Sequence, residues 1–395
     1  MPPSAVVIGR FPPPLDGQAL ATRRLAELLA PHYAVERVNL SPGDGGHAES
    51  DVTLRASRIQ HYLRLRRHVA ERLRTAPAAP VLWASISPMP LGHWRDLVVL
   101  APLFQPCQTV YGVVHWGNFD RLFRSPWTAL TATWLVRRLE GFVFTDDALA
   151  ARCAPWIPAH KRHAIPNTID ADLHCTDAEV AAKREAYSSA RPFRLLFLSN
   201  MIVSKGYLDV LEAVRLLRDE GLAVHADFVG RWQDDADRQA FAGLVDQHEL
   251  GAQVTHHGGV FDRDRVKRFY LQADAFVLPT YYPTEAHPVS IIEALNAGTP
   301  ILTTHHASIP GMVRERHEAL FVPKQAPAAI AEAVQQVAEP STWHRLAVGA
   351  RARYLQRFSA SAIQRRWLDL LERPRVTGPL LASHRLPFHR APVRS

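Results

Sequence analysis

The sequence predicts an α/β protein of two Rossmann-like, doubly wound domains that face each other across a central cleft. Short apolar runs rich in β-branched residues alternate with longer segments of helical periodicity, a pattern typical of parallel sheets covered by helices on both faces. The chain has 395 residues, and domains of ~100–200 residues each make two the expected number. A polar, alanine-rich stretch that ends at Ser189 interrupts the pattern once, and a second series begins after it.

Each series supplies one predicted domain, residues 1–175 and residues 190–340. The strands end where glycine, proline or a polar residue follows an apolar run, and the helices repeat apolar residues at three- and four-residue spacing. The predicted strands are 5–9, 34–40, 81–85, 108–114 and 141–145 in the first domain, and 193–199, 223–230, 253–257, 275–278, 299–303 and 319–322 in the second. The predicted helices of the two series are 18–30, 52–74, 128–139, 207–220 and 289–297.

The chain after the second series is predicted to be helical and then irregular. Helical periodicity covers 326–337, 342–357 and 359–371. For the helices of residues 341–372, a return to the N-terminal domain is one arrangement that stays open. Residues 373–395 are basic and rich in proline, and we expect this tail to be disordered.

Composition limits the classes of partner and the compartment. The formal net charge is 46 − 38 = +8, which favours an acidic partner such as a phosphorylated molecule or an anionic membrane. No apolar run reaches the ~20 residues that span a bilayer, and no signal sequence is evident at the N-terminus. Three isolated cysteines without ligand spacing favour reduced thiols. These features predict a cytoplasmic protein.

The stretch "TEAHPVSIIEALNAGTPIL" is the strongest candidate for a site, because ligands of doubly wound folds bind after the carboxyl ends of strands. Glu285 precedes a predicted helix start, where Pro288 suits the first helical position. The backbone amides of Val289, Ser290 and Ile291 then lack helical partners and form a ready anion site. Glu293 lies inside the helix. Taken alone, each acid has a simpler interpretation, Glu293 as a solvated helix residue and Glu285 as a carboxylate at a helix start.

A second candidate loop, "SNMIVSKG", follows another predicted strand. Lys205 stands at the start of the next helix, where the helix dipole disfavours a cation unless an anion lies beside it. With "IPNTID" and "NAGTPILTTHHASIPGMV", these stretches make the chain similar to a retaining glycosyltransferase of family four, whose fold is GT-B. The Glu, seven residues, Glu spacing of Glu285 and Glu293 is the best-known mark of that family. The likeness covers nearly all of residues 5–371.

The resemblance implies a role for each candidate residue. Glu293 corresponds to the carboxylate that binds the ribose of a nucleotide-diphosphate sugar, and Lys205 to the cation on its diphosphate. Glu285 corresponds to the acid beside the transferred sugar, with His115 of "VVHWGNF" meeting that sugar from the acceptor-side, N-terminal domain. Gly17 corresponds to the glycine loop near the diphosphate and acceptor. The family retains the anomeric configuration and requires neither metal nor cofactor.

Two departures from the family pattern concern donor binding. Asn200 stands where many members have an arginine, and Arg231 is a candidate replacement for its charge. His287 and Pro288 stand where Phe-Gly is frequent, which affects the amides that recognise the sugar. All four residues are candidates for donor binding.

Other motifs carry different interpretations. The "DRD" stretch at Asp262 lies before a predicted helix, where aspartate is a common cap, and we expect no metal there. The basic segment 55–74 is predicted to be an amphipathic helix whose arginines either face solvent or approach an anionic membrane or lipid-linked acceptor. No aromatic and basic RNA motif or recognition helix supports nucleic-acid binding.

The sequence therefore predicts a hexosyltransferase that uses a nucleotide sugar and a saccharide or lipid-linked acceptor, in polysaccharide, lipopolysaccharide or glycoconjugate synthesis. It is expected in the cytoplasm, with peripheral attachment to the inner face of the membrane as an option. A non-catalytic nucleotide-sugar binding protein of the same fold is the alternative, prompted by Asn200. This predicted donor site requires that Lys205 and the Pro288 turn face the seam between the domains. It also requires that Glu285 form no ion pair within the protein.

Overall fold

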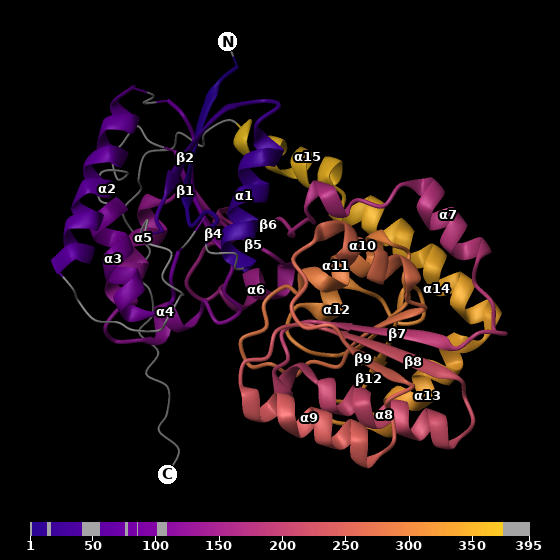
Figure 1. The fold of residues 1–395 in the computed structure, drawn as a ribbon. Helices are drawn as coiled ribbons and strands as arrows, with labels where there is room; N and C mark the ends of the chain where they lie inside the picture. Colours follow the sequence, from indigo (N-terminus) through magenta and orange to yellow (C-terminus); the bar gives the residue numbers. More distant parts are fainter. Residues whose placement is uncertain are drawn as a thin grey trace.

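Two parallel sheets of six strands each form the two domains of the protein (Figure 1). The computed structural model describes residues 2–13, 17–41, 56–75, 78–84, 86–100 and 109–373. All strand pairs within both sheets are parallel, so the chain crosses over through a helix or long connection after nearly every strand.

The first sheet has the strand order β2-β1-β3-β4-β5-β6. Its strands are β1 (Ser4–Gly9), β2 (Ala34–Asn39), β3 (Val81–Trp83), β4 (Val110–Val114), β5 (Gly141–Phe144) and β6 (Arg162–Ala164). Its helices are α1 (Gly17–Leu29), α2 (Ala56–Thr75), α3 (Pro90–Leu100), α4 (Arg121–Arg124), α5 (Ala129–Arg138) and α6 (Asp147–Arg152). β1, β4 and β5 are buried throughout apart from Ser4, and their alternate side chains supply a separate apolar core on each face of the sheet.

The second sheet has the order β12-β11-β10-β7-β8-β9. Its strands are β7 (Phe193–Leu198), β8 (Val224–Val229), β9 (Val254–His256), β10 (Ala275–Leu278), β11 (Ile301–Thr304) and β12 (Ala319–Val322). Its helices are α7 (Asp177–Glu185), α8 (Tyr207–Asp219), α9 (Asp235–Gln247), α10 (Arg263–Gln272), α11 (Val289–Asn296), α12 (Ile309–Met312), α13 (Pro327–Ala338) and α14 (Pro340–Arg353). The order reverses between the adjacent central strands β7 and β10, so the crevice between their carboxyl ends is where such sheets bind ligands.

The last helix, α15 (Ala360–Leu371), leaves the second domain and packs against α1 of the first (Figure 1). Ile363, Trp367 and Leu370 form one apolar stripe at three- and four-residue spacing and join the core of the first sheet. The Tyr111 hydroxyl donates to the Leu370 carbonyl at 3.4 Å, and the Gln364 amide donates to the Leu28 carbonyl at 2.6 Å. The chain thus crosses the domain seam a second time.

Several element boundaries differ from the sequence-based expectation. β6 was not predicted, because its Arg-His-Ala is half-buried and lacks an apolar run. α3 was not predicted either, since its polar His93 and Asp96 are buried and obscure the helical pattern. The predicted helix 342–357 begins at Pro340 and ends in a π-helical turn, Tyr354–Phe358.

Some predicted segments fall outside the described residues. These are the first four residues of the predicted helix 52–74, residue 85 of the predicted strand 81–85, residue 108 of the predicted strand 108–114, and the tail from residue 374 onward. Among the helices that the structure describes, none is long and apolar enough to cross a membrane.

Candidate active site

The loops after β7 and β10 meet at the switch point of the second sheet. After β7 the chain passes Asn200 and a short 3-10 helix, Val203–Lys205, and reaches Gly206 at φ 86°. This left-handed backbone favours glycine, and a Cβ at Gly206 would lie 2.7 Å from the Pro279 carbonyl. The Tyr281 amide donates to the Ser204 carbonyl at 2.8 Å. The two loops are therefore held against each other by backbone contacts.

Lys205 and Glu285 form an ion pair at this meeting point. The Lys205 Nζ lies 2.6 Å from Glu285 Oε2, which also accepts the Thr280 hydroxyl at 3.1 Å. The same Nζ lies 4.8 Å from the centre of the Tyr282 ring. Both charged side chains are largely buried. The requirement that Glu285 be free of an internal ion pair is thus not met in the unliganded chain; its partner is the cation expected to bind diphosphate.

The start of α11 lies directly after this pair. The helix begins at Val289, so Pro288 is the residue before the helix rather than its first residue as predicted. The Ile291 amide donates to the Pro288 carbonyl at 3.2 Å, which takes it out of the expected set of three partnerless amides. Val289 and Ser290 belong to the first turn, whose amides lack partners inside the helix.

Glu293 lies just over one turn along α11 and is buried. Its Oε2 accepts the Tyr270 hydroxyl at 2.8 Å, and its Oε1 lies 3.8 Å from an Arg263 nitrogen. Burial raises the pKa of Glu293, while the charge of Arg263 and the bond from Tyr270 oppose that rise. A carboxylate held by a hydroxyl and approached by a guanidinium has acceptor capacity left for a ligand hydroxyl.

One loop of the first domain reaches the Glu285 loop directly. Gly117 follows β4, and a Cβ placed there would lie 2.4 Å from the Glu285 carbonyl oxygen. His115, two residues earlier, is close enough to His287 to contribute to the lowering of the latter's pKa. Only glycine permits this approach of two backbones, because any Cβ would clash. The backbone at Gly117 of the first domain therefore packs directly against the loop that follows β10.

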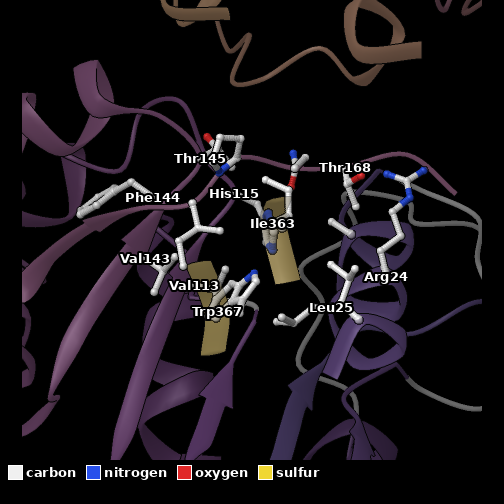
Figure 2. A pocket seen from close by; sticks show the side chains of 15 residues that line it. Arg24, Leu25, Val113, His115, Val143, Phe144, Thr145, Thr168, Ile363 and Trp367 are labelled. Atoms are coloured by element: carbon white, nitrogen blue, oxygen red, sulfur yellow. The ribbon is translucent and has the colours of Figure 1, made fainter. Parts of the chain in front are cut away.

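His115 is a neutral histidine at the seam. Burial lowers its pKa to about 4, and its buried Nε2 has no hydrogen-bond partner among the described residues. It lines a small cavity together with Arg24, Thr145 and Thr168 (Figure 2). The cavity extends below the seam toward Trp367 of α15. Burial likewise lowers the pKa of His287 to about 3, assisted by Arg357 and His115.

A cluster of three arginines and one aspartate joins the domains beside Glu293. Asp170, which is buried in the connection between the sheets, accepts bonds from Arg23 and Arg24 of α1 and from Arg263 of α10. Burial alone would raise the pKa of Asp170, but the hydrogen bonds and charges of the arginines lower it to about 2. Arg263 is shared with Glu293, so the cluster links α1 of the first domain to that acid.

We expect Asp170→Asn to destabilise the protein at neutral pH by about 1–2 kcal/mol. The folded pKa of Asp170 lies below its unfolded value, so its contribution is present above about pH 4 and is lost as the pH falls toward 2. Urea unfolding at pH 7 and pH 3 measures this: the difference between wild type and variant should shrink at the lower pH. A difference that stays constant would contradict the ionic role, and Asp246→Asn, at an exposed position of α9, is the matched control.

Three further predicted residues lie at the surface. Asn200 and Arg231 are exposed, and the Met201 amide donates to the Arg231 carbonyl at 2.9 Å, so the loops that carry them run side by side. The Arg231 guanidinium lies 5.4 Å from the centre of the Phe261 ring. Gly17 is the exposed first residue of α1, with open space where a Cβ would lie. The roles of these residues stay predictions.

Sequence reasoning missed several residues of this region, and we add them from the contacts. They are Arg23, Arg24, Gly117, Thr280, Asp170, Arg263 and Tyr270. Asp170 was within reach, since it ends the quoted "IPNTID" stretch. Asp262 caps α10 by accepting the Arg265 amide at 3.2 Å, in line with its interpretation as a cap.

Comparisons with known proteins agree on the class. Residues 181–353 match the family model described as glycosyl transferases group 1. AmsK, an amylovoran biosynthesis glycosyltransferase of Erwinia amylovora, is 23% identical over 46% of this chain and 45% of its own. A protein of Salmonella typhimurium named as a colanic acid biosynthesis glycosyltransferase, WcaL, is 26% identical over 48% of this chain and 47% of its own. The chain thus aligns with about half the length of these relatives.

Solved structures resemble nearly the whole chain. A sucrose-phosphate synthase from Thermosynechococcus elongatus covers 93% of this chain and 98% of its own, with a TM-score of 0.68 at 19% identity. HepE of Anabaena, in complex with UDP and glucose, covers 93% and 99%, with a TM-score of 0.67 at 14% identity. The predicted GT-B fold is confirmed. The match of residues 181–353 to the group 1 model confirms the expected resemblance to glycosyltransferases, while the assignment to family four and to a retaining mechanism stays a prediction.

Proposed function

We propose that the protein is a retaining, metal-independent glycosyltransferase that takes a sugar from a nucleotide-diphosphate sugar. The observation that carries this proposal is the Lys205–Glu285 pair at the switch point of the second sheet, touched from the first domain at Gly117. Relatives that align with about half of the chain are named as glycosyltransferases, and HepE is seen with UDP-glucose. The site combines a cation, a helix start and two acids, the groups that such a donor needs.

Donor binding then exchanges partners within the pair. In the free protein each charge of Lys205 and Glu285 is neutralised by the other. A diphosphate at the amides of Val289 and Ser290 competes with the carboxylate for Lys205, because its charge is larger and the helix dipole favours it. Glu285 is thereby left facing the sugar, where its charge stabilises a developing oxocarbenium ion.

The transfer step breaks the bond between the anomeric carbon and a diphosphate oxygen and forms one to the acceptor oxygen on the same face. The acceptor proton passes to the departing diphosphate oxygen. His115, which is neutral above about pH 5 because burial lowers its pKa to about 4, serves as a hydrogen-bonding group toward the sugar rather than as a cation. Glu293 binds the ribose hydroxyls beside Tyr270.

The acceptor is proposed to be a saccharide or lipid-linked saccharide, in polysaccharide, lipopolysaccharide or glycoconjugate synthesis. Relatives named for colanic acid, amylovoran and teichuronic acid synthesis support the first of these. We place the protein in the cytoplasm, on the inner face of the membrane where lipid-linked acceptors are exposed.

A thermal-shift screen tests the donor assignment. We expect one nucleoside diphosphate or its hexose conjugate to stabilise the protein by about 2.7 kcal/mol at a hundredfold excess over its dissociation constant. Lys205→Ala should remove most of this shift, while Lys324→Ala, an exposed lysine outside the pair, should keep it. A screen in which no nucleotide raises the melting temperature of the wild type would contradict the proposal.

A nucleotide-sugar binding protein without turnover is the second candidate, because Asn200 is exposed in the donor loop where an arginine is frequent in the family. It predicts calorimetric affinity for a donor together with no hydrolysis and no transfer over a broad acceptor panel. Asn200→Arg would then tighten diphosphate binding. Any turnover that depends on Glu285 rejects this candidate.

A further inference from the structure

Two stripes of exposed apolar side chains lie on the first domain, away from the candidate site. On α5 and the residue stretch before it, Trp127 is 77% and Leu130 83% exposed, and Trp134 follows one turn later. Leu130 and Trp134, four residues apart, lie on one side of α5, and Trp127 lies in the turn just before the helix. On α3, the exposed residues are Leu91, Trp94 and Val98, again with one-sided spacing. We call both stripes together the α3–α5 face.

α3 and α5 are neighbours on the same face of the sheet. His93 Nε2 lies 2.7 Å from the Thr131 hydroxyl, which joins one helix to the other. α2 packs against α3, and the three helices share one apolar core. α1 and α15 lie on the opposite face of the sheet, toward the second domain (Figure 1). The stripes therefore occupy the side of the first domain that faces away from the second.

Arginines lie on the neighbouring helix α2 and at the end of α5. A surface groove along α2 is lined by Leu63, Ala70 and three arginines, Arg66, Arg67 and Arg74. Among the described residues, Arg66 and Arg67 form no ion pair with a carboxylate. α5 ends in exposed Arg137 and Arg138, and the Arg138 guanidinium lies 5.5 Å from the centre of the Trp134 ring.

The exposed acids of the same helices are fewer. They are Glu71 on α2 and Glu140 just beyond α5. Like charges around the stripes disfavour a second copy of this face as the occupant and favour an anionic surface.

We propose that the α3–α5 face is a membrane-contact surface, with Trp127, Leu130 and Trp94 inserted among lipid headgroups and the α2 arginines on anionic phosphates. Tryptophan suits this position because its ring is apolar while its N–H is polar, and single exposed apolar residues are common but a cluster is not. The inference rests on the proposed function, since a lipid-linked acceptor must be reached at a bilayer. The sequence analysis considered α2 as the helix that approaches the membrane. The structure instead favours α3 and α5 as the main site of membrane contact.

Sedimentation of the full chain with vesicles tests this surface. We expect binding to phosphatidylglycerol vesicles and weak binding to phosphatidylcholine vesicles. The double variant Trp127→Ala, Leu130→Ala should lower the partition coefficient about tenfold or more. Both side chains are exposed, so the core is unaffected. Val348→Ala, an exposed apolar residue on α14, should bind as the wild type does.

Brominated lipids distinguish insertion from charge attraction alone. Tryptophan fluorescence of the wild type should be quenched by them, and the part due to Trp127 should be lost in Trp127→Phe. Arg66→Ala with Arg67→Ala should weaken binding at low salt, whereas insertion should leave part of the binding at 0.5 M salt.

Two outcomes would overturn the inference. One is equal binding of the wild type and the Trp127, Leu130 double variant. The other is a concentration-dependent dimer that dissociates in this variant, which would assign the face to a second copy. Donor hydrolysis without vesicles separates this test from that of the proposed function: hydrolysis with no vesicle binding rejects only the surface, and binding with no hydrolysis rejects only the transferase.

Discussion

Glu285→Gln should lower transfer and donor hydrolysis by about 100- to 1000-fold while leaving donor affinity within a few-fold of the wild type. Glutamine has the size of glutamate and its oxygen accepts the Thr280 hydroxyl and the Lys205 ammonium, so the loop geometry is kept. What is lost is the negative charge beside the developing cation of the sugar. Hydrolysis of the donor without acceptor, followed beside calorimetry, separates these two effects.

A surface acid provides the control for this substitution. Glu332 is exposed on α13, and Glu332→Gln changes the net charge equally without touching the site. It should retain full activity. A Glu285→Gln protein as active as this control would remove the acid from the mechanism, and one with no donor affinity would show that the pair only stabilises the loop.

Gly117→Ala should reduce turnover by about 100-fold, because a methyl group 2.4 Å from the Glu285 carbonyl oxygen forces two backbones apart. The displaced loops carry His115 in one domain and Glu285 in the other, so a shift of about 1 Å disturbs the acid and the histidine together. The cores of the two domains are untouched. Kinetics with the preferred donor, together with circular dichroism, measures the loss of rate against the retained fold.

The same substitution in open space should behave differently. A Cβ at Gly243, inside α9, meets nothing within 4 Å. Gly243→Ala should therefore leave turnover unchanged and raise stability by about 0.5–1 kcal/mol, as expected for alanine in a helix. Wild-type turnover in Gly117→Ala would mean that the two loops do not approach each other in the working protein.

The order of the elements could be predicted because it depends on local pattern. Apolar runs of β7 and β10 end at polar loops, and parallel strands place their carboxyl ends at one edge, which brought Lys205 and Glu285 to the same region. Helical periodicity predicted the helix α15, which carries Ile363 and Trp367. The periodicity does not specify which surface this apolar stripe covers, and the structure places it on the core of the first sheet. β6 escaped prediction because its half-buried Arg-His-Ala lacks an apolar run, and α3 because tertiary contacts bury its polar His93 and Asp96.

Sequence alone determined the two-domain α/β architecture, the strand-end position of the candidate acids and the absence of a long apolar segment, since each follows from residue type and spacing. Three contacts depend on the tertiary structure. Lys205 forms an ion pair with Glu285, and Gly117 of the first domain packs against the backbone of the Glu285 loop. Asp170 accepts hydrogen bonds from three arginines. Lys205 and Glu285 are 80 positions apart in the sequence, and Gly117 and Glu285 are 168 apart. Asp170 is 93 to 147 positions from its three arginines. Local sequence preferences do not specify contacts between residues so far apart, because those contacts form only when the whole chain folds.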